Sequence, residues 1–274
     1  MNRKSVFIGG VLVLCLIGFF SILTLLNHQE EVVAPRDYPE IKEEGVLRAI
    51  TEYNSVSYQS VNDTLSGFHY ELLQAFAAEQ GLKVEVTPAM SIKERFSGIS
   101  TGAYDVLAYH MLVTQEGKDT LLYTHPILLS KQVLVQRKQT DEQDTTYIKN
   151  PLQLGHKTIY LVKDAPFKLR IRNLSNEIGD TIYIQEIEKY GSEQLLALVA
   201  NKDIDYMVCD EHIALSAQKD FPDLDISLPI SFTQFYAWGV NQNSPILLDS
   251  LNHWIDRYKT TDAYKMLIKK YIEK

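Results

Sequence analysis

The hydrophobic and polar positions of this chain switch repeatedly between the two-residue period of a strand and the longer period of a helix. In the first half, the strand pattern or a short apolar run covers residues 46–51, 82–87 and 105–109. The helical spacing between the first two stops at Gly81. Ser91 and Glu94 then form a capping-box pattern ahead of a second helix. This order predicts a β-α-β-α-β unit.

The same alternation returns later in the chain. Predicted strands cover residues 158–162, 181–185 and 205–209, and predicted helices start near Pro166, Ser192 and Glu211. Two such sets predict two mostly parallel sheets with helices on their faces. Long strands at 132–136 and 234–240 flank the second set and are interpreted as a two-stranded hinge. After Ser244-Pro245, two helical stripes are expected to pack rather than bind.

Residues 6–26 contain no charged side chain, and as a helix they would span roughly 30 Å, the thickness of a bilayer core. Arg3 and Lys4 would hold the N-terminus in the cytoplasm. The expectation is a single-pass inner-membrane anchor with the globular part in the periplasm. A cleaved signal, or a lipidated Cys15, is the alternative.

These patterns divide the chain into consecutive parts. The predicted parts are an N-terminal anchor (1–28), a linker (29–40), a first lobe (41–136), a second lobe (137–232), and a return strand with C-terminal helices on the first lobe (233–274).

Composition narrows the function classes. A formal net charge of −8 without a basic stripe argues against nucleic-acid binding. Cys15 lies in the predicted anchor and Cys209 in an apolar run, so no disulfide is expected. The sequence has no His-Glu-x-x-His, phosphate-loop or Gly-x-Ser-x-Gly motif, so neither a metal, a cofactor nor a catalytic motif is predicted.

Several segments, in this order, resemble a known family. They are Gly45-Val-Leu-Arg-Ala, Gly67-Phe-His-Tyr-Glu-Leu-Leu, Gly102-Ala-Tyr-Asp-Val-Leu-Ala, Leu112-Val-Thr-Gln-Glu, Tyr123-Thr-His-Pro and Asp203-Ile-Asp-Tyr-Met-Val-Cys-Asp. Together they are similar to the type 2 periplasmic solute-binding proteins of family 3, and in particular to the solute-binding half of membrane-bound lytic transglycosylases F. The catalytic domain of those enzymes is not expected in this sequence, which also lacks a Glu-Ser dipeptide.

The resemblance implies a small ligand between two lobes, with no cofactor. It implies that the ligand contacts aromatic rings and a helix N-terminus of the first lobe, polar groups after the third strand, and acidic side chains of the second lobe. The candidate residues are Tyr53, Tyr58, Gly67, Phe68, Tyr109, His110, Thr114, Asp164 and Asp210.

Two departures from the family pattern bear on the ligand. Gly117 stands where amino-acid binders have an arginine for the ligand's carboxylate, and Lys118 follows it. The segment with Lys163 and Asp164 replaces a small hydroxyl pair. A cationic, peptide-like or sugar-linked ligand is therefore favoured over a free α-amino acid.

Simpler roles remain open for several of these residues. Asp210 could only cap the following helix. Tyr53 and Tyr58 could be half-buried core rings, and His110 could be a structural histidine.

Three functions follow from the resemblance. The first is a membrane-anchored receptor that clasps an amino-acid-like, peptide-like or cationic ligand and delivers it to an ABC permease or signals its presence. The second is a non-catalytic regulator that senses cell-wall fragments beside a cell-wall enzyme. The third is a dehydratase-like cleft enzyme, which would need a buried acid such as Glu52 or Asp210 with a raised pKa.

Overall fold

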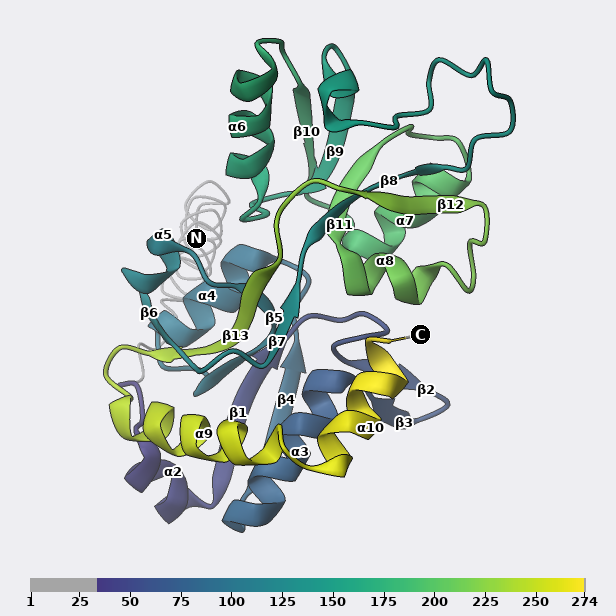
Figure 1. The fold of residues 1–274 in the computed structure, drawn as a ribbon. Coiled ribbons are helices and arrows are strands. Elements are labelled where there is room, and N and C mark those ends of the chain that lie inside the picture. The colour runs from purple at the N-terminus through teal and green to yellow at the C-terminus, as the bar shows by residue number, and fades with distance from the viewer. Residues whose placement is uncertain (1–33, 274) are drawn as a thin grey trace, which may run out of the picture. The chain divides into compact units, whose positions relative to one another are not determined.

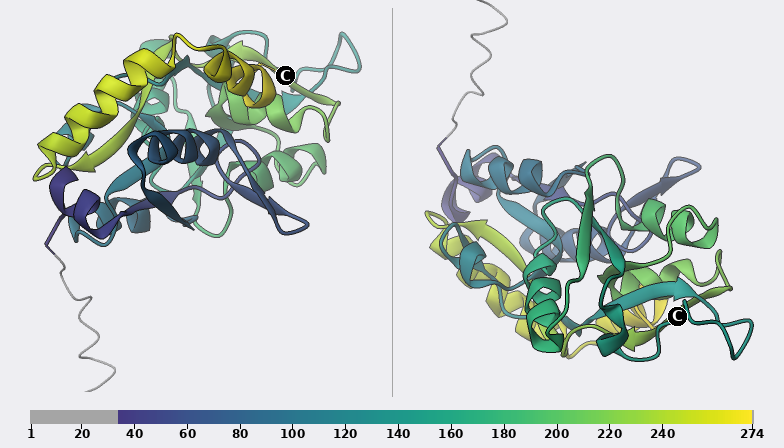
Figure 2. Two further views of the ribbon diagram at one scale, coloured as in Figure 1. Left: turned by 90° about the horizontal axis from the view of Figure 1, so that it is seen from below. Right: turned by 90° about the horizontal axis from the view of Figure 1, so that it is seen from above.

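Two sheets divide the described part of the chain into two lobes (Figures 1 and 2). The computed structural model describes residues 34–273, so the predicted anchor at 6–26 lies outside the described residues. Within 34–273, no helix is both long and apolar enough to cross a membrane. The part built on the first sheet is called lobe 1 below, and the part built on the second sheet lobe 2.

The sheet of lobe 1 combines parallel and antiparallel strands. Its strands are β1 (Val46–Thr51), β4 (Lys83–Pro88), β5 (Val106–Leu112), β6 (Leu121–Tyr123), β7 (Leu128–Ser130) and β13 (Gln234–Asn241). The order is β4-β1-β5-β13-β6, and β7 also pairs with β13. Strands β4, β1 and β5 are parallel, and β13 is antiparallel to its neighbours. A separate hairpin joins β2 (Gln59–Val61) and β3 (Thr64–Ser66).

Helices cover both faces of this sheet. They are α2 (Tyr38–Glu44), α3 (Phe68–Gln80), α4 (Ile92–Ser100), α5 (Gln115–Lys118), α9 (Pro245–Tyr258) and α10 (Asp262–Tyr271). Val106 and Ala108 of β5 pack in the core with α3, α9 and α10, whereas Leu107 and Tyr109 pack in the core with α4. Successive side chains of a strand point to opposite faces, so one apolar strand serves two cores.

Lobe 2 repeats this design. Its strands are β8 (Gln132–Arg137), β9 (Thr158–Val162), β10 (Tyr183–Ile187), β11 (Met207–Asp210) and β12 (Leu224–Pro229), in the order β10-β9-β11-β8-β12. Strands β10, β9 and β11 are parallel. Its helices are η1 (Pro151–Leu154), α6 (Lys168–Ile178), α7 (Ser192–Ala200) and α8 (Glu211–Ala217). Helix α6 packs in one core and α7 and α8 in the other, as the alternating pattern predicts.

The chain passes between the lobes at two places. Strand β7 pairs with β13 in lobe 1, and β8 starts two residues later in lobe 2. The return passage lies between β12 and β13. The strand expected at 132–136 was grouped with the first lobe, but it lies between β11 and β12 in lobe 2. It is apolar on both faces, which suits a central strand better than a free connection.

Helix α2 lies partly inside the predicted linker at 29–40. The Asp37 side chain accepts a hydrogen bond from the Tyr38 N–H, Glu40 completes a capping box, and Pro39 occupies the first turn. A proline at this position favours a helix start, so a helix begins within the segment that was predicted as a linker. The other predicted boundaries stay predictions.

Candidate functional site

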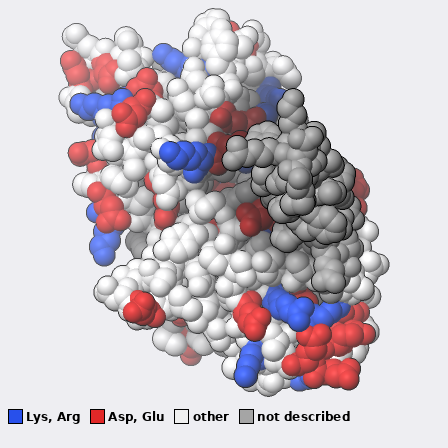
Figure 3. Space-filling model, turned by 180° about the vertical axis from the view of Figure 1, so that it is seen from behind, with Lys and Arg blue, Asp and Glu red and all other residues white. Residues whose placement is uncertain are grey.

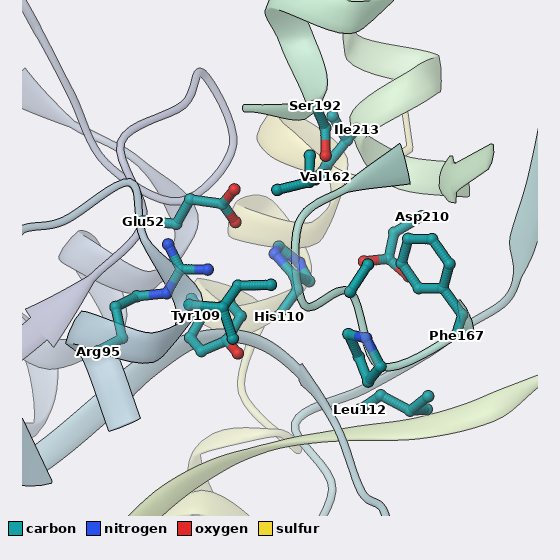
Figure 4. Close-up of a pocket in the computed structure, with 13 residues that line it drawn as sticks. Glu52, Arg95, Tyr109, His110, Leu112, Val162, Phe167, Ser192, Asp210 and Ile213 are labelled. Atoms are coloured by element: carbon teal, nitrogen blue, oxygen red, sulfur yellow. The ribbon is translucent and has the colours of Figure 1, made fainter. Parts of the chain in front are cut away.

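A cavity lies between the lobes, at the ends of strands from both sheets (Figure 4). Lobe 1 supplies Glu52, Ile92, Arg95, Tyr109, His110 and Leu112, and lobe 2 supplies Val162, Ala165, Pro166, Phe167, Ser192, Asp210 and Ile213. Glu52 follows β1 and Asp210 ends β11, and ligands of open α/β sheets bind at this edge. The cavity measures about 40 Å³, room for a few water molecules, so the two lobes stand close together.

Two larger hollows adjoin this cavity. One, of about 260 Å³, is lined by Thr114 and Tyr123 of lobe 1 and by Asp164 of lobe 2. The other, of about 300 Å³, lies between Lys93 and Glu188. All three are lined by Ile92, so together they form one cleft along the start of α4.

Asp210 projects a carboxylate toward this cavity from lobe 2 (Figure 4). It accepts hydrogen bonds from Gln132 Nε2 (3.1 Å) and from the hydroxyl of Tyr236. Burial raises the pKa of Asp210 to about 7 despite these two bonds, and the charge of Glu52 adds to the rise. Asp210 occupies the N-cap position of α8, but its side chain makes no capping hydrogen bond. The simple cap alternative therefore does not describe its contacts.

Glu52 and Arg95 face the cavity from lobe 1. Glu52 is 8% exposed, and burial raises its pKa while the positive charge of Arg95 opposes the rise. Arg95 is 1% exposed, and its guanidinium lies 4.3 Å from the centroid of the Tyr109 ring. Its Nη1 donates to the carbonyls of Ala89 (2.6 Å) and Met90 (3.1 Å).

A chain of hydrogen bonds fixes His110 beneath the cavity. Trp238 Nε1 donates to His69 Nδ1 (2.8 Å), and His69 Nε2 lies 3.0 Å from His110 Nδ1. Because an indole nitrogen only donates, the proton of neutral His69 sits on Nε2, and that of His110 on its own Nε2. His212 of lobe 2 stacks on His110 with ring centroids 3.6 Å apart.

All three histidines are uncharged at neutral pH. Burial lowers the pKa of His69 and of His110 well below the usual value, and lowers that of His212 to about 3. The closest aromatic contact between the lobes is therefore a stack of neutral rings, which assigns His110 a structural contact as well as a place in the cavity wall.

The structure brings five of the nine predicted site residues together. Tyr109, His110 and Asp210 line the cavity, and Thr114 and Asp164 line the adjoining hollow. Thr114 also caps α5, and Asp164 has a positive φ of 62°.

The other four predicted residues do not line the three hollows. Tyr53 is 42% exposed and touches Tyr58 edge to face. Phe68 is fully buried in the lobe 1 core. Gly67 has φ 141°, and a Cβ there would lie 2.3 Å from the carbonyl oxygen of Ser57, so this glycine permits close backbone contact. Packing accounts for Gly67 and Phe68 in this structure, and a ligand contact by any of the four stays a prediction.

Sequence reasoning missed Arg95 as a site residue and considered Glu52 only as a possible catalytic acid. One signal for Arg95 was present: it shares the inward stripe of α4 with Ile92 and Ile99, where a charged residue is unusual. The position of Tyr123 accounts for a glycine at residue 117, because a Cβ there would lie 1.8 Å from the Tyr123 hydroxyl. The ring of Tyr123 occupies the space of a side chain at that position.

Charge and metal chemistry set further limits. Acidic and basic side chains are interspersed on the face shown in Figure 3, without a continuous basic stripe there. Across residues 34–273, no group of three or more histidine, cysteine, aspartate or glutamate side chains is arranged to hold a metal ion.

Known proteins match this chain in sequence and fold. Residues 47–274 match the family "Bacterial extracellular solute-binding proteins, family 3". A membrane-bound lytic murein transglycosylase F from Desulfosudis oleivorans is 28% identical over 235 residues, 85% of this chain and 50% of that protein. The chain spans about half the length of the curated relatives it matches.

Two solved structures share the fold. A mutant of ArgBP from T. maritima has a TM-score of 0.74 and 21% identity, covering 86% of this chain and 99% of its own. The ancestral amino acid-binding protein AncCDT-1, described as a precursor of cyclohexadienyl dehydratase, has a TM-score of 0.72 and 21% identity, covering 85% and 98%. These likenesses concern the fold alone. Since the family match covers most of the chain and agrees with the two-lobed fold, the chain belongs to the family 3 bacterial extracellular solute-binding proteins.

Proposed function

We propose that this protein clasps a small ligand with a cationic group between its lobes. The observation that carries the proposal is the pair of carboxylates, Glu52 from lobe 1 and Asp210 from lobe 2, that face one closed cavity. Among residues 34–273, no lysine or arginine nitrogen lies within 4.0 Å of either carboxylate. Buried carboxylates without a paired positive charge are costly, and a ligand ammonium or guanidinium group would neutralise them.

Contacts across the cleft support closure around a ligand. The Ser55 N–H in lobe 1 donates to Glu193 Oε1 in lobe 2 at 2.9 Å, and the hydroxyls of Ser55 and Ser216 lie 3.1 Å apart. Within residues 34–273 two chain passages join the lobes, so rotation about them can open and close the cleft while both cores stay intact.

The proposed setting is the periplasmic face of the inner membrane, with residues 6–26 as the anchor. The uncharged run and the basic residues Arg3 and Lys4 support this orientation. The chain should then sediment with membranes and be released only by detergent. Recovery of a shortened soluble form from the periplasm would contradict the anchor.

The output of binding has two candidate partners. The family favours delivery to an ABC permease. The similarity to proteins named membrane-bound lytic murein transglycosylase F favours instead a regulator that senses cell-wall fragments beside a cell-wall enzyme. Co-purification of the full chain with either class of partner, before and after ligand addition, separates the two.

A cleft enzyme needs a buried acid with a raised pKa, and Asp210 has that property. The same property suits a cation binder, so the discriminating measurement is turnover. A ligand recovered unchanged after prolonged incubation with the protein supports a receptor, and a new product supports an enzyme.

The direct test of the proposal is binding by the purified full chain. Small molecules that co-purify with it are identified by mass spectrometry, and a panel of amino acids, peptides and amines is titrated calorimetrically. At least one cationic ligand should bind, and Asp210→Asn should weaken it, because the amide keeps the side-chain volume but removes the charge. Equal affinity in the wild type and Asp210→Asn would overturn the proposal.

A further inference from the structure

We propose that Arg95 is the anion-binding group of this cleft, so that the ligand is a zwitterion whose carboxylate meets α4 of lobe 1 while its cationic group meets Glu52 and Asp210. This inference rests on the proposed function and names the chemical class of the ligand.

The first observation is the incomplete hydrogen bonding of the Arg95 guanidinium. Its partners within residues 34–273 are the two carbonyls of Ala89 and Met90, both bonded through Nη1. Its Nε is buried without a partner. A guanidinium carries five N–H groups in a planar fork, so donors remain for a further acceptor.

The second observation is the direction of the side chain. Arg95 lines the cavity, and its guanidinium points into the space between Glu52, Tyr109 and His110 (Figure 4). The Tyr109 ring below it fixes the plane of the fork from one side. A carboxylate that entered the cavity would meet guanidinium N–H groups that still have no acceptor.

The third observation is that no salt bridge joins Glu52 to Arg95. The two side chains line the same cavity, yet no ion pair within 4 Å joins them among the described residues. One guanidinium and two carboxylates, those of Arg95, Glu52 and Asp210, line one cavity and match a ligand that carries both charges. A simple amine would pair with the acids but leave the remaining donors of Arg95 without an acceptor.

The fourth observation concerns Gly117, which stands where amino-acid binders of the family have an arginine. A Cβ at Gly117 would lie 1.8 Å from the Tyr123 hydroxyl, so a side chain there would require Tyr123 to move. Lys118 is exposed and lines none of the three hollows. Ile92 and Phe96 of helix α4 line the 260 Å³ hollow together with Gly117. Arg95 of the same helix lines the adjoining cavity, so it would supply the positive charge from a neighbouring element.

The test uses matched ligands with and without a carboxylate. L-lysine is compared with cadaverine, and L-arginine with agmatine, by calorimetric titration of the full chain. The wild type should bind at least one zwitterion about 100-fold more tightly than its decarboxylated partner, because the amine forgoes the paired bonds to Arg95. This comparison requires no mutation.

The variant Arg95→Met should reduce the ratio of the affinity for the zwitterion to the affinity for the amine to about one. Its affinity for the amine should stay within about threefold of the wild-type value. Arg95→Lys should keep part of the preference, since lysine retains the charge but not the fork. Arg137→Met is the matched control: Arg137 also donates through Nη1 to two carbonyls, those of Val199 and Ile204, but lies in lobe 2 outside the cleft. It should leave the ratio unchanged.

A thermal melt of each variant accompanies the titrations. If Arg95 were only structural, Arg95→Met would weaken the zwitterion and the amine equally, which would overturn the inference. Amine binding without any preference for the zwitterion would overturn the role of Arg95 and leave the proposed function standing. Failure of the wild type to bind any of the four probes would overturn both in their present form.

Discussion

The two lobes contribute to the cleft in different ways. In lobe 1, Arg95 is bonded to backbone carbonyls, and His110 is joined through His69 to Trp238 in the core. These groups are therefore fixed by packing within one lobe. In lobe 2, Asp210 is positioned by Gln132 and Tyr236, which lie beside the two passages between the lobes.

This difference links the hinge to the site. Gln132 is the first residue of β8, and Tyr236 belongs to β13 of lobe 1, so the Tyr236 hydroxyl contacts Asp210 across the boundary. A ligand that changes the charge state of Asp210 acts directly on a contact that depends on lobe position. Lobe 1 provides a preformed surface, and lobe 2 provides the group that responds to closure.

The largest expected effect comes from Asp210→Ala. If Asp210 pairs with a cation in a desolvated cleft, the variant should lose about 2–5 kcal/mol of binding free energy, roughly 30- to several-thousand-fold in affinity. Asp203→Ala, at an exposed position of the same lobe, is the control and should bind normally. Calorimetry beside a thermal melt separates binding from folding. Normal affinity with a stability loss of about 1 kcal/mol would restore the helix-cap interpretation.

The second-largest effect is expected at the stacked rings of His110 and His212 between the lobes. His212 faces His110 and Tyr236, and its Nδ1 lies 3.1 Å from the Ser130 hydroxyl. The pKa of His212 is about 3 in the folded protein, below the value of 6.5 in the unfolded chain. On acidification the unfolded chain therefore binds a proton first. The contribution of His212 to the unfolding free energy is complete above pH 6.5 and is lost as the pH falls toward 3. Between pH 7 and pH 5 this group alone should remove about 2 kcal/mol of unfolding free energy.

The variant His212→Phe keeps a ring in the stack and removes the titrating group. It should reduce the loss of stability between pH 7 and pH 5 by about 2 kcal/mol, measured by denaturant unfolding at both pH values. His253→Phe, at an exposed position of α9, should keep the acid sensitivity of the wild type. An unchanged pH dependence in His212→Phe would show that the stack does not couple to protonation.

A smaller effect is expected in the pH dependence of binding. Because burial raises the pKa of Asp210 to about 7, the ligand-free protein must release a proton from this group before it pairs with a cation at lower pH. Affinity for a cationic ligand should be nearly constant above pH 7 and fall about tenfold per pH unit below it. Titrations in two buffers with different ionisation heats should show proton release near pH 6. Affinity that rises on acidification would contradict the assignment.

The smallest effect is expected for Tyr53→Ala. This ring lies outside the three hollows, so affinity should change by less than about threefold, and the edge contact to Tyr58 should cost about 0.5–1.5 kcal/mol of stability. A large loss of affinity would mean that the hairpin side of lobe 1 closes over the ligand after all.

The elements that sequence reasoning found share one property: each has a local pattern. Strand β9 was predicted with the same bounds as observed, because its apolar run ends at polar turns on both sides. Helix α3 ends before Gly81, which adopts the left-handed conformation. The short strands β6 and β7 were missed, since three residues carry no period that distinguishes them from loop.

The site was predictable where it follows the strand ends and not where it depends on helix packing. Asp210 and Tyr109 follow from the positions of β11 and β5. Arg95 comes from a helix whose rotation about its axis is set by tertiary contacts with Ile50 and Tyr104 in the same core. The pattern around Gly67 and Phe68 was interpreted as a binding loop because a helix starts there, but that helix start is bonded to Val56 and covered by the core.

We expect a ligand to close the lobes upon each other, with residues 41–130 and 234–274 moving as one body and residues 132–230, which include β8, as the other. Lys93 in lobe 1 and Glu188 in lobe 2 are exposed and line opposite sides of one hollow. Spin labels attached at Lys93→Cys and Glu188→Cys, in a Cys15→Ser background, report the distance across the cleft by electron double resonance. A ligand that calorimetry shows to bind should shorten and narrow the distance distribution. A distribution unchanged by saturating ligand would show that binding does not close the lobes.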